Sequence, residues 1–235
     1  MNNPRLTILV TTFNEEGSIE ECIRRILQVY PSDCEVLIVD GGIDRTGDIV
    51  QQLEAQFPSV RYIRNENDRG KGHAVQTGIA HARGRLIAQI DADLQFLPEE
   101  LPLLLAPLEA GTADVVLGSR FLPASVRLPG STPALRTFGN YVTSAFASLL
   151  VWHRMSDVLA GMKAWSNKAS QKIPLRCLHC SYDAEIAVKA VMQGLRVVDV
   201  PITTDARKAG NSQIHVARDG MVILRDILLF RLGIR

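Results

Sequence analysis

The fold can be inferred from one segment, Leu86-Ile-Ala-Gln-Ile-Asp-Ala-Asp-Leu-Gln95. An apolar run rich in Ile and Leu is typical of a strand buried on both faces of a sheet, and this run stops at Asp91 and Asp93. Side chains alternate faces along an extended chain, so positions 91, 93 and 95 are expected on one side. Two carboxylates and an amide oxygen suit a hard divalent cation that also binds substrate phosphates. The alternative is that Asp-Ala-Asp only ends a strand before Pro98.

Strand-like and helix-like segments alternate from Leu6 to Arg120. Apolar runs predict strands over 6–12, 35–39, 61–64, 86–91 and 114–118. Apolar positions at helical spacing predict helices over 19–27, 46–57, 73–82 and 98–110, the first of them capped by Ser18. This alternation predicts the α/β class, with a mostly parallel central sheet and helices on both faces.

The pattern changes beyond Arg120. A Pro-rich link over 121–133 precedes a long predicted helix over 134–152, and a loop over 157–162 enters a short strand. Asn167 is expected to cap a brief helix, and a further helix is expected over 182–192. Pro201 places the strand over 195–203 near a sheet edge. A basic loop over 207–212 then leads to a basic amphipathic helix over 216–230, a type that either packs on its own domain or lies on an anionic membrane surface.

Polar side chains gather where the predicted strands end. In open parallel sheets, ligands bind beyond the carboxyl ends of the strands. Those ends carry Glu15, Asp40, Asp91, Asp93, Gln95 and Arg120. We expect a nucleotide there, with a metal ion bridging its diphosphate to the paired aspartates and with Glu15 and Asp40 accepting hydrogen bonds from base or ribose. The candidates for stabilising a leaving diphosphate are Arg120, Arg136 and Arg207. No Gly-x-Gly-x-x-Gly follows the first strand, which argues against a dinucleotide site.

Composition limits the partners and the compartment. The net charge of +1 gives no global reason to bind nucleic acid. Four scattered cysteines indicate a reducing compartment, and Cys177-Leu178-His179-Cys180 lacks the second ligand pair of a zinc site. The N-terminus has no signal-peptide pattern, and the longest mostly apolar stretch, 138–152, is shorter than the roughly 20 residues of a membrane span. We therefore expect a cytoplasmic protein without a transmembrane anchor.

Short motifs occur in a characteristic order along the chain. They are Thr11-Thr12-Phe13-Asn14-Glu15, Val36 to Asp40, Arg69-Gly70-Lys71-Gly72, Asp91-Ala92-Asp93-Leu94-Gln95, Gly118-Ser119-Arg120, Asp157 with Ala160-Gly161, and Arg207-x-x-Gly210-x-Ser212. Together they resemble family 2 glycosyltransferases of the GT-A fold, in particular the dolichol-phosphate (polyprenol-phosphate) mannose synthase branch. The resemblance covers residues 6–214.

The resemblance implies a nucleotide-sugar donor, Mg²⁺ or Mn²⁺, and inversion at the anomeric carbon. By position, it assigns the nucleoside to Thr11, Phe13, Glu15 and Asp40, and the metal and diphosphate to Asp91, Asp93 and Gln95. It assigns the donor and acceptor phosphates to Arg120, Arg136, Arg207 and Ser212, and Asp157 to the vicinity of the sugar. Lys71 joins the substrate-binding set. Asp93, Arg120, Asp157 and Arg207 are the predicted catalytic residues.

The chain departs from the family pattern around the substrate pockets. The second strand is followed by Gly41-Gly42, so that one acid of the usual Asp-Asp-Gly-Ser is missing. Ser-Gly-Phe-Arg is replaced by Ala160-Gly161-Met162-Lys163, and Gln213 stands in place of a lysine. The metal-binding triplet is intact, which indicates retained chemistry with a sugar specificity that the motifs do not define.

One GT-A catalytic domain over 1–235 is expected. Residues 1–120 form its nucleotide-sugar and metal half, 121–215 its acceptor half, and 216–235 its C-terminal amphipathic helix. The first functional hypothesis is hexose transfer to a polyprenyl phosphate at the cytoplasmic membrane face, reached through that helix or through a separate membrane partner. The second is transfer to a sugar hydroxyl in glycan assembly, which requires Asp183 or Glu185 as base. The third is nucleotide binding without turnover.

Overall fold

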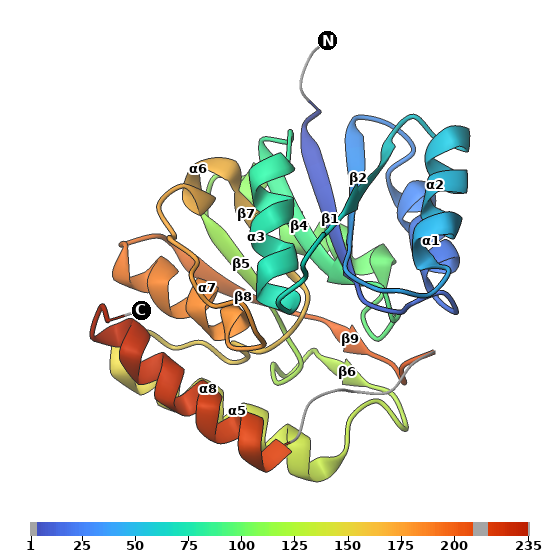
Figure 1. The fold of residues 1–235 in the computed structure, drawn as a ribbon. Helices are drawn as coiled ribbons and strands as arrows, with labels where there is room; N and C mark the ends of the chain where they lie inside the picture. The colour runs from blue at the N-terminus through green and yellow to red at the C-terminus, as the bar shows by residue number, and fades with distance from the viewer. Residues whose placement is uncertain (1–3, 209–215, 235) are drawn as a thin grey trace.

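A seven-stranded mixed sheet forms the centre of the computed structural model, which describes residues 4–208 and 216–234 (Figure 1). The strand order is β3-β2-β1-β4-β7-β5-β8. The strands are β1 Leu6–Thr12, β2 Cys34–Asp40, β3 Val60–Arg64, β4 Leu86–Asp91, β5 Val115–Ser119, β7 Lys163–Ser166 and β8 Val197–Pro201. Only β7 runs antiparallel to its neighbours, β4 and β5. A second sheet pairs β6 Val126–Arg127 with β9 Thr203–Thr204.

Helices cover both faces of the sheet. They are α1 Ile19–Val29, α2 Thr46–Gln56, α3 Lys71–His81, the 3₁₀ turn η1 Pro98–Glu100, α4 Leu101–Glu109, α5 Ala134–Val151, α6 Asn167–Ser170, α7 Tyr182–Met192 and α8 Val216–Arg231. Alternate residues of β1 face opposite sides, so Ile8 packs in the core under α1, α2 and α4, whereas Leu9 packs in the core under α3 and α7. This two-faced burial explains why the central strands are mostly apolar on both faces.

The register of the parallel strands brings their carboxyl ends to one edge of the sheet. Thr11 of β1 is opposite Asp91 of β4, and Thr12 is opposite Asp40 of β2. In Figure 1 the carboxyl end of β1 points toward the side of the molecule where β6, β9 and α5 lie. Side chains from both halves of the sequence can therefore meet at this edge.

Most predicted elements are confirmed, including β1 and α7 with their predicted bounds, the long helix α5, and β8 at the sheet edge. Two predicted caps are wrong. The Ser18 hydroxyl donates to Glu15 instead of capping α1, and the brief helix α6 is capped by Ser166, whose hydroxyl accepts from the Ala169 amide. In both places a neighbouring polar group competes for the bond. No helix among the described residues is long and apolar enough to cross a membrane.

Candidate active site

Asp91 ends β4 and forms an ion pair with Lys71, the first residue of α3. The Lys71 Nζ lies 2.6 Å from Asp91 Oδ1 and 5.8 Å from the centre of the Tyr182 ring. Burial opposes the charged form of Lys71, but Asp91, Tyr182 and Asp183 together outweigh burial and raise the lysine pKa well above its usual value. A Cβ at Gly161 would lie 2.2 Å from Asp91 Oδ2. Glycine is thus required at position 161 for the backbone to lie against this carboxylate.

Asp93 lies in a turn and not in an extended chain. The strand ends at Asp91, and Leu94 adopts a left-handed backbone with φ 59°. The prediction that positions 91, 93 and 95 share one face of a strand is therefore wrong in its geometry. The two acids still lie near each other across this turn. Burial raises the pKa of Asp93, and the neighbouring Asp91 carboxylate raises it further. The backbone N–H of Gln95 donates to Asp93 Oδ1 at 3.0 Å. Its side-chain Nε2 donates to the Ser131 carbonyl at 2.8 Å.

Arg207, which follows β9, reaches the acids from the other half of the chain. Its Nη2 lies 2.9 Å from Asp93 Oδ2, and its Nη1 lies 3.8 Å from Glu15 Oε1. The next residue, Lys208, donates its backbone N–H to the Asp93 carbonyl at 3.2 Å. Burial, followed by repulsion from Asp93, raises the pKa of Glu15 to about 7. The sequence prediction that Arg207 and the strand-end acids share one site is consistent with these contacts.

The acids fit a divalent cation with ligands from a substrate. The described residues contain no group of three or more His, Cys, Asp or Glu side chains arranged to hold a metal by themselves. Asp91 and Asp93 do lie close enough to repel each other. Mg²⁺ and similar ions are commonly held by one or two carboxylates together with water and substrate phosphates. The donor set of Asp91, Asp93 and the Gln95 amide therefore suits a metal that arrives with a diphosphate.

Arg120 forms a buried two-point ion pair with Asp157. Its Nε and Nη2 donate to Oδ2 and Oδ1 of Asp157 at 2.6 and 2.8 Å, and its backbone N–H adds a third bond at 3.2 Å. Asp157 is 0% exposed. Such a bidentate pair fixes the guanidinium plane. Asp157, predicted near the sugar, is thus engaged with Arg120 and orients that side chain.

Arg136 lies near these cations in the first turn of α5. Burial, followed by the charges of Arg207 and Arg120, lowers the pKa of Arg136. Arg136 therefore lies close enough to both Arg207 and Arg120 for their charges to repel its own. A site that brings cations together in this way favours a ligand with several negative charges.

The predicted nucleoside residues have different surroundings. Phe13 is 53% exposed, whereas Thr11 is buried and its hydroxyl has no hydrogen-bond partner among the described residues. Asp40 is 1% exposed. Its carboxylate accepts from the Thr12 hydroxyl, the Gly42 amide, the Tyr62 hydroxyl and the Arg64 guanidinium. Asp40 therefore shapes the loop after β2 and has no oxygen free for a base. Ser212 lies outside the described residues.

A buried charged cluster that the sequence pattern did not predict lies beside Asp91. Lys163 is 0% exposed and donates to Asp183 and to the Ala160 carbonyl. Burial raises the pKa of Asp183, which the charges of Lys163 and Lys71 oppose. The signal was a lysine inside the apolar segment Met162-Lys163-Ala164-Trp165, where an unpaired charge would be costly.

Glu185, the other proposed base, has a structural role. It is 0% exposed and accepts the backbone N–H groups of Arg176 and Cys177 at 2.9 and 2.8 Å and the Lys189 ammonium at 2.5 Å. Both carboxylate oxygens thus serve α7 and the loop before it.

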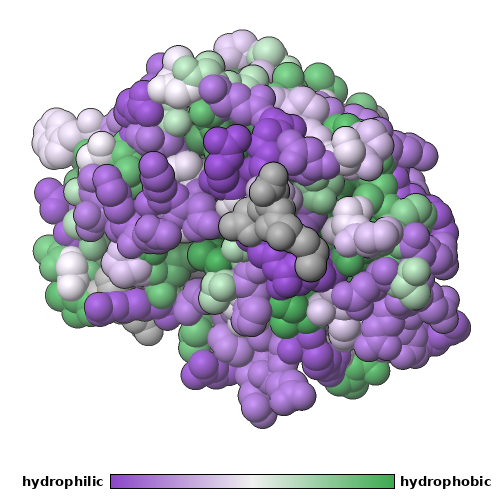
Figure 2. Space-filling model, turned by 90° about the horizontal axis from the view of Figure 1, so that it is seen from above, coloured by the Kyte–Doolittle hydropathy of each residue, from purple (hydrophilic) through white to green (hydrophobic). Residues whose placement is uncertain are grey.

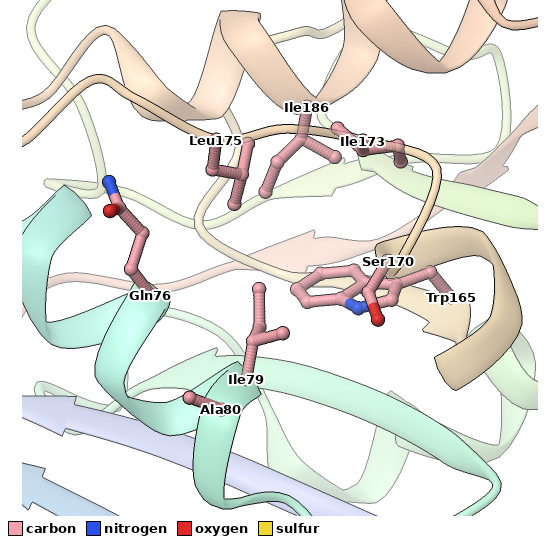
Figure 3. Close-up of a pocket in the computed structure, with 8 residues that line it drawn as sticks. All are labelled: Gln76, Ile79, Ala80, Trp165, Ser170, Ile173, Leu175 and Ile186. Atoms are coloured by element: carbon pink, nitrogen blue, oxygen red, sulfur yellow. The ribbon is translucent and has the colours of Figure 1, made fainter.

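An apolar cavity of about 250 Å³ lies at the other end of α3 (Figure 3). Ile79 points toward Ile173, Leu175 and Ile186, with the Trp165 ring beside them. No titratable side chain lines it. The cavity is about two helical turns from Lys71 along α3 and supplies no group for the chemistry of the acids.

The chain is similar to known glycosyltransferases along most of its length. The family model described as glycosyl transferase family 2 matches residues 7–161. The chain is 30% identical over 233 residues to the low-salt glycan biosynthesis hexosyltransferase Agl6 of Haloferax volcanii, covering 96% of this chain and 54% of that protein. It is 26% identical over 246 residues to the undecaprenyl-phosphate mannosyltransferase of Micrococcus luteus, covering 98% and 100% respectively. The chain thus spans about half of the first relative and all of the second.

The fold is similar to that of glucosyl-3-phosphoglycerate synthase from Mycobacterium tuberculosis, solved in complex with Mn²⁺, UDP and glucosyl-3-phosphoglycerate. The TM-score is 0.72 at 19% identity, and the match covers 98% of this chain and 80% of that one. At this identity the similarity establishes the GT-A fold.

Proposed function

Because this chain belongs to glycosyltransferase family 2, we propose that it transfers a hexose from a nucleotide-diphosphate sugar to a polyprenyl or dolichyl phosphate, with inversion at the anomeric carbon. The donor is of the GDP-mannose or UDP-glucose type. One observation carries the proposal: the paired acids Asp91 and Asp93 lie at the same edge of the sheet as the arginines at 120, 136 and 207. The acids suit a metal with its diphosphate, and the arginines suit phosphates.

The donor side consists of residues that follow β1 and β4. Asp91, Asp93 and Gln95 would hold Mg²⁺ or Mn²⁺, which supplies charge neutralisation to the diphosphate leaving group. Lys71 and Arg207 already balance the two aspartates. Phe13, exposed at the end of β1, offers a ring face to the base, and Glu15 offers an acceptor to the ribose. Asp40 supports this pocket indirectly through the loop that it holds.

The acceptor side consists of arginines. An oxygen of the lipid phosphate attacks the anomeric carbon from the face opposite the diphosphate. The new C–O bond forms as the bond to the diphosphate breaks, and the nucleoside diphosphate leaves with the electron pair. A phosphate monoester has a second pKa of about 6 and is largely dianionic at neutral pH, so it needs no strong general base. Arg136 and Arg207 would bind that phosphate with Ser212, and Arg120, oriented by Asp157, would stabilise the leaving charge.

The hydroxyl-acceptor hypothesis now depends on Asp183 alone. Glu185 is engaged with two backbone amides and Lys189 and has no free oxygen for a substrate. Burial raises the pKa of Asp183, the charge of Lys71 lowers it, and the charge of Asp91 raises it. A raised pKa is what a general base requires. Replacing Asp183 by Asn distinguishes the two acceptors, because transfer to a lipid phosphate does not require its carboxylate to remove a proton.

The test is a radiolabel transfer assay. The protein is offered GDP-mannose, UDP-glucose and UDP-GlcNAc with Mg²⁺ or Mn²⁺ and a short-chain polyprenyl phosphate. We expect metal-dependent label in the organic phase and a loss of about a hundredfold or more on Asp93→Ala. The matched control is Asp48→Ala on the exposed side of α2, which should retain activity. If no donor labels the lipid although calorimetry detects metal-dependent nucleotide binding, the lipid-phosphate proposal is wrong.

A further inference from the structure

The loop after β2 leaves room for an acid from another segment of the chain. Gly41 stands where the family pattern Asp-Asp-Gly-Ser has its second acid. A Cβ at Gly41 would lie 2.6 Å from Cγ and 2.7 Å from Oδ2 of Asp68, well inside van der Waals contact. The Asp68 carboxylate therefore occupies the volume that a side chain at position 41 would fill.

Backbone pairing brings Asp68 to the loop after β2. Strands β2 and β3 are parallel, with Asp40 opposite Arg64. The pairing continues past the strand ends, because the Asn65 N–H donates to the Asp40 carbonyl at 2.8 Å. The face at the top of Figure 1, where β1 begins, is mostly hydrophilic with scattered apolar residues (Figure 2). Asp68 belongs instead to the other end of the sheet, the carboxyl edge that carries the candidate site.

The two carboxylate oxygens of Asp68 have different surroundings. Oδ1 accepts from the Asn65 side chain at 2.7 Å and from the Gly70 N–H at 3.2 Å, and the His73 Nδ1 lies 3.6 Å away. Oδ2 lies against Gly41 and accepts no hydrogen bond from the residues that the structure describes. The side chain is 14% exposed. One oxygen thus fixes the carboxylate, and the other is available to a ligand.

Asp40, the acid of the family pattern that this chain retains, cannot take the same role. Its two oxygens already accept four hydrogen bonds within the protein. The neighbouring Gly41 N–H donates to the Thr12 carbonyl at 3.1 Å, and the exposed Phe13 follows Thr12. The free oxygen of Asp68 therefore lies beside the loop that contacts the end of β1, where the Phe13 ring is available to stack on a base.

A carboxylate at this place can distinguish one kind of base from another. An ionised carboxylate accepts hydrogen bonds and donates none. Uracil and guanine carry a ring N–H on the edge that faces a pairing partner, whereas cytosine and adenine carry a bare ring nitrogen there, which is an acceptor. A buried or half-buried acceptor left facing another acceptor is costly. Such a carboxylate favours uracil and guanine over cytosine and adenine.

We propose that Asp68 supplies, from the loop after β3, the base-selecting carboxylate that the loop after β2 lacks. Its Oδ2 accepts the ring N–H of the uracil or guanine of the donor nucleotide. Gly41 is the second half of the arrangement, because a side chain there would displace Asp68. The inference rests on the proposed function for the nucleotide donor and deepens it, since it names the residue that selects the base.

The experiment is calorimetric binding of UDP, GDP, CDP and ADP to the full chain with Mn²⁺. We expect the parent to bind UDP or GDP at least about tenfold more tightly than CDP and ADP. Asp68→Asn keeps one oxygen for Asn65 and Gly70 but places a donating NH₂ group against the base. The preferred nucleotide should therefore bind about tenfold more weakly, and its preference over CDP and ADP should disappear.

The matched control is Glu66→Gln in the same loop. Glu66 is exposed, and its replacement makes the same acid-to-amide change. This variant should keep the base preference of the parent. The readout is the ratio of affinities among the four nucleotides, which a partly unfolded sample does not change, because unfolding lowers all four affinities alike.

A second pair of variants tests position 41. Asp68→Gly alone should lose the base preference. Adding Gly41→Asp to it returns an acid to the position that the family uses, without a clash, because the Asp68 side chain is gone. The double variant should recover a preference for UDP or GDP of about fivefold or more.

Three results would overturn the inference. The first is the same base preference in Asp68→Asn and Glu66→Gln. The second is a parent that binds all four nucleotides alike. The third is a double variant with no more preference than Asp68→Gly alone.

The hexose transfer assay separates this inference from the proposed function. Transfer to the lipid phosphate together with a base preference that ignores Asp68 means that the inference is wrong and the function stands. A base preference that depends on Asp68, without transfer to any acceptor phosphate, means the reverse.

Discussion

Helices α5 and α7 both begin at the candidate site, yet they relate to the core in opposite ways. Arg136 lies in the first turn of α5, and Tyr182 and Asp183 lie in the first turn of α7. Nine consecutive residues of α7, from Tyr182 to Ala190, are buried. Only three residues of α5 are buried among eighteen. The acidic residues of the site are thus held by a helix that is buried in the core. Arg136 is held by a helix whose large apolar side chains are mostly exposed.

The buried polar groups of the two helices also have different partners. In α7, buried charges are paired, as in Glu185 with Lys189 and Asp183 with Lys163. In α5, buried hydroxyls satisfy backbone groups, and charge stays near the ends of the helix. The comparison predicts a graded series of effects when each helix is altered.

The largest effect is expected for Glu185→Ala in α7. The change leaves the Lys189 ammonium and two backbone N–H groups buried without their acceptor. Breaking a buried pair by removing one partner costs about 3 to 5 kcal/mol. Urea unfolding followed by circular dichroism should show a loss of this size in the free energy of unfolding.

The matched control is Glu20→Ala in α1. Its partner Arg24 lies one turn away, and both side chains are about half exposed. A change of at most about 1 kcal/mol is expected there. Equal losses for Glu20→Ala and Glu185→Ala would show that α7 does not depend on its buried charges.

A smaller effect is expected for Ser144→Ala on the buried side of α5. The Ser144 hydroxyl accepts the Val158 amide at 3.1 Å and donates to the Asn140 carbonyl at 2.9 Å. Removing it leaves the buried Val158 amide unpaired, which costs about 1 to 3 kcal/mol. Ala145→Ser on the exposed side should change the same free energy of unfolding by less than about 0.5 kcal/mol. A larger loss at 145 than at 144 would mean that α5 is rotated relative to the structure.

The sequence predicted the elements better than the side-chain contacts. Apolar runs and helical spacing located β1, α5 and α7, because burial in a sheet or on a helix face is a local pattern. The same reasoning failed for Asp93, since the left-handed Leu94 turns the chain where extended geometry was assumed.

Pairs between distant segments were also beyond local reasoning. Motif position placed Arg120 and Asp157 in one site, but only the fold shows that they bond each other. Lys163 with Asp183, and Asp40 with its four donors, likewise depend on strand pairing and helix packing that a single sequence does not specify.

Replacing Glu15 is expected to stabilise the protein at high pH, whereas replacing Glu185 is expected to destabilise it. Burial and Asp93 raise the pKa of Glu15 from 4.5 to about 7, so the folded chain holds this proton more tightly than the unfolded chain. Stability should therefore decrease as the pH rises from about 4.5 to about 7. Glu15→Gln removes this titration and keeps an acceptor for the Ser18 hydroxyl.

The measurement for Glu15→Gln is the melting temperature as a function of pH, without divalent cations. The variant should melt higher than the parent above about pH 7, and the difference should disappear near pH 4.5. The gain should be modest, because Arg207 partly balances the Glu15 charge. A variant less stable than the parent at high pH would show that Glu15 is a stabilising partner of Arg207.

The smallest effect on stability is expected for the exposed apolar side chains of α5. Phe138→Gln and Leu149→Gln remove side chains that are both 65% exposed and leave no cavity or unpaired group. Surface substitutions of this type stay within about 0.5 kcal/mol. Urea unfolding of each variant checks this, with Ile186→Ala in α7, 2% exposed, as the buried counterpart that should lose about 2 to 5 kcal/mol. A loss of more than about 2 kcal/mol at 138 or 149 would mean that these side chains are already covered in solution.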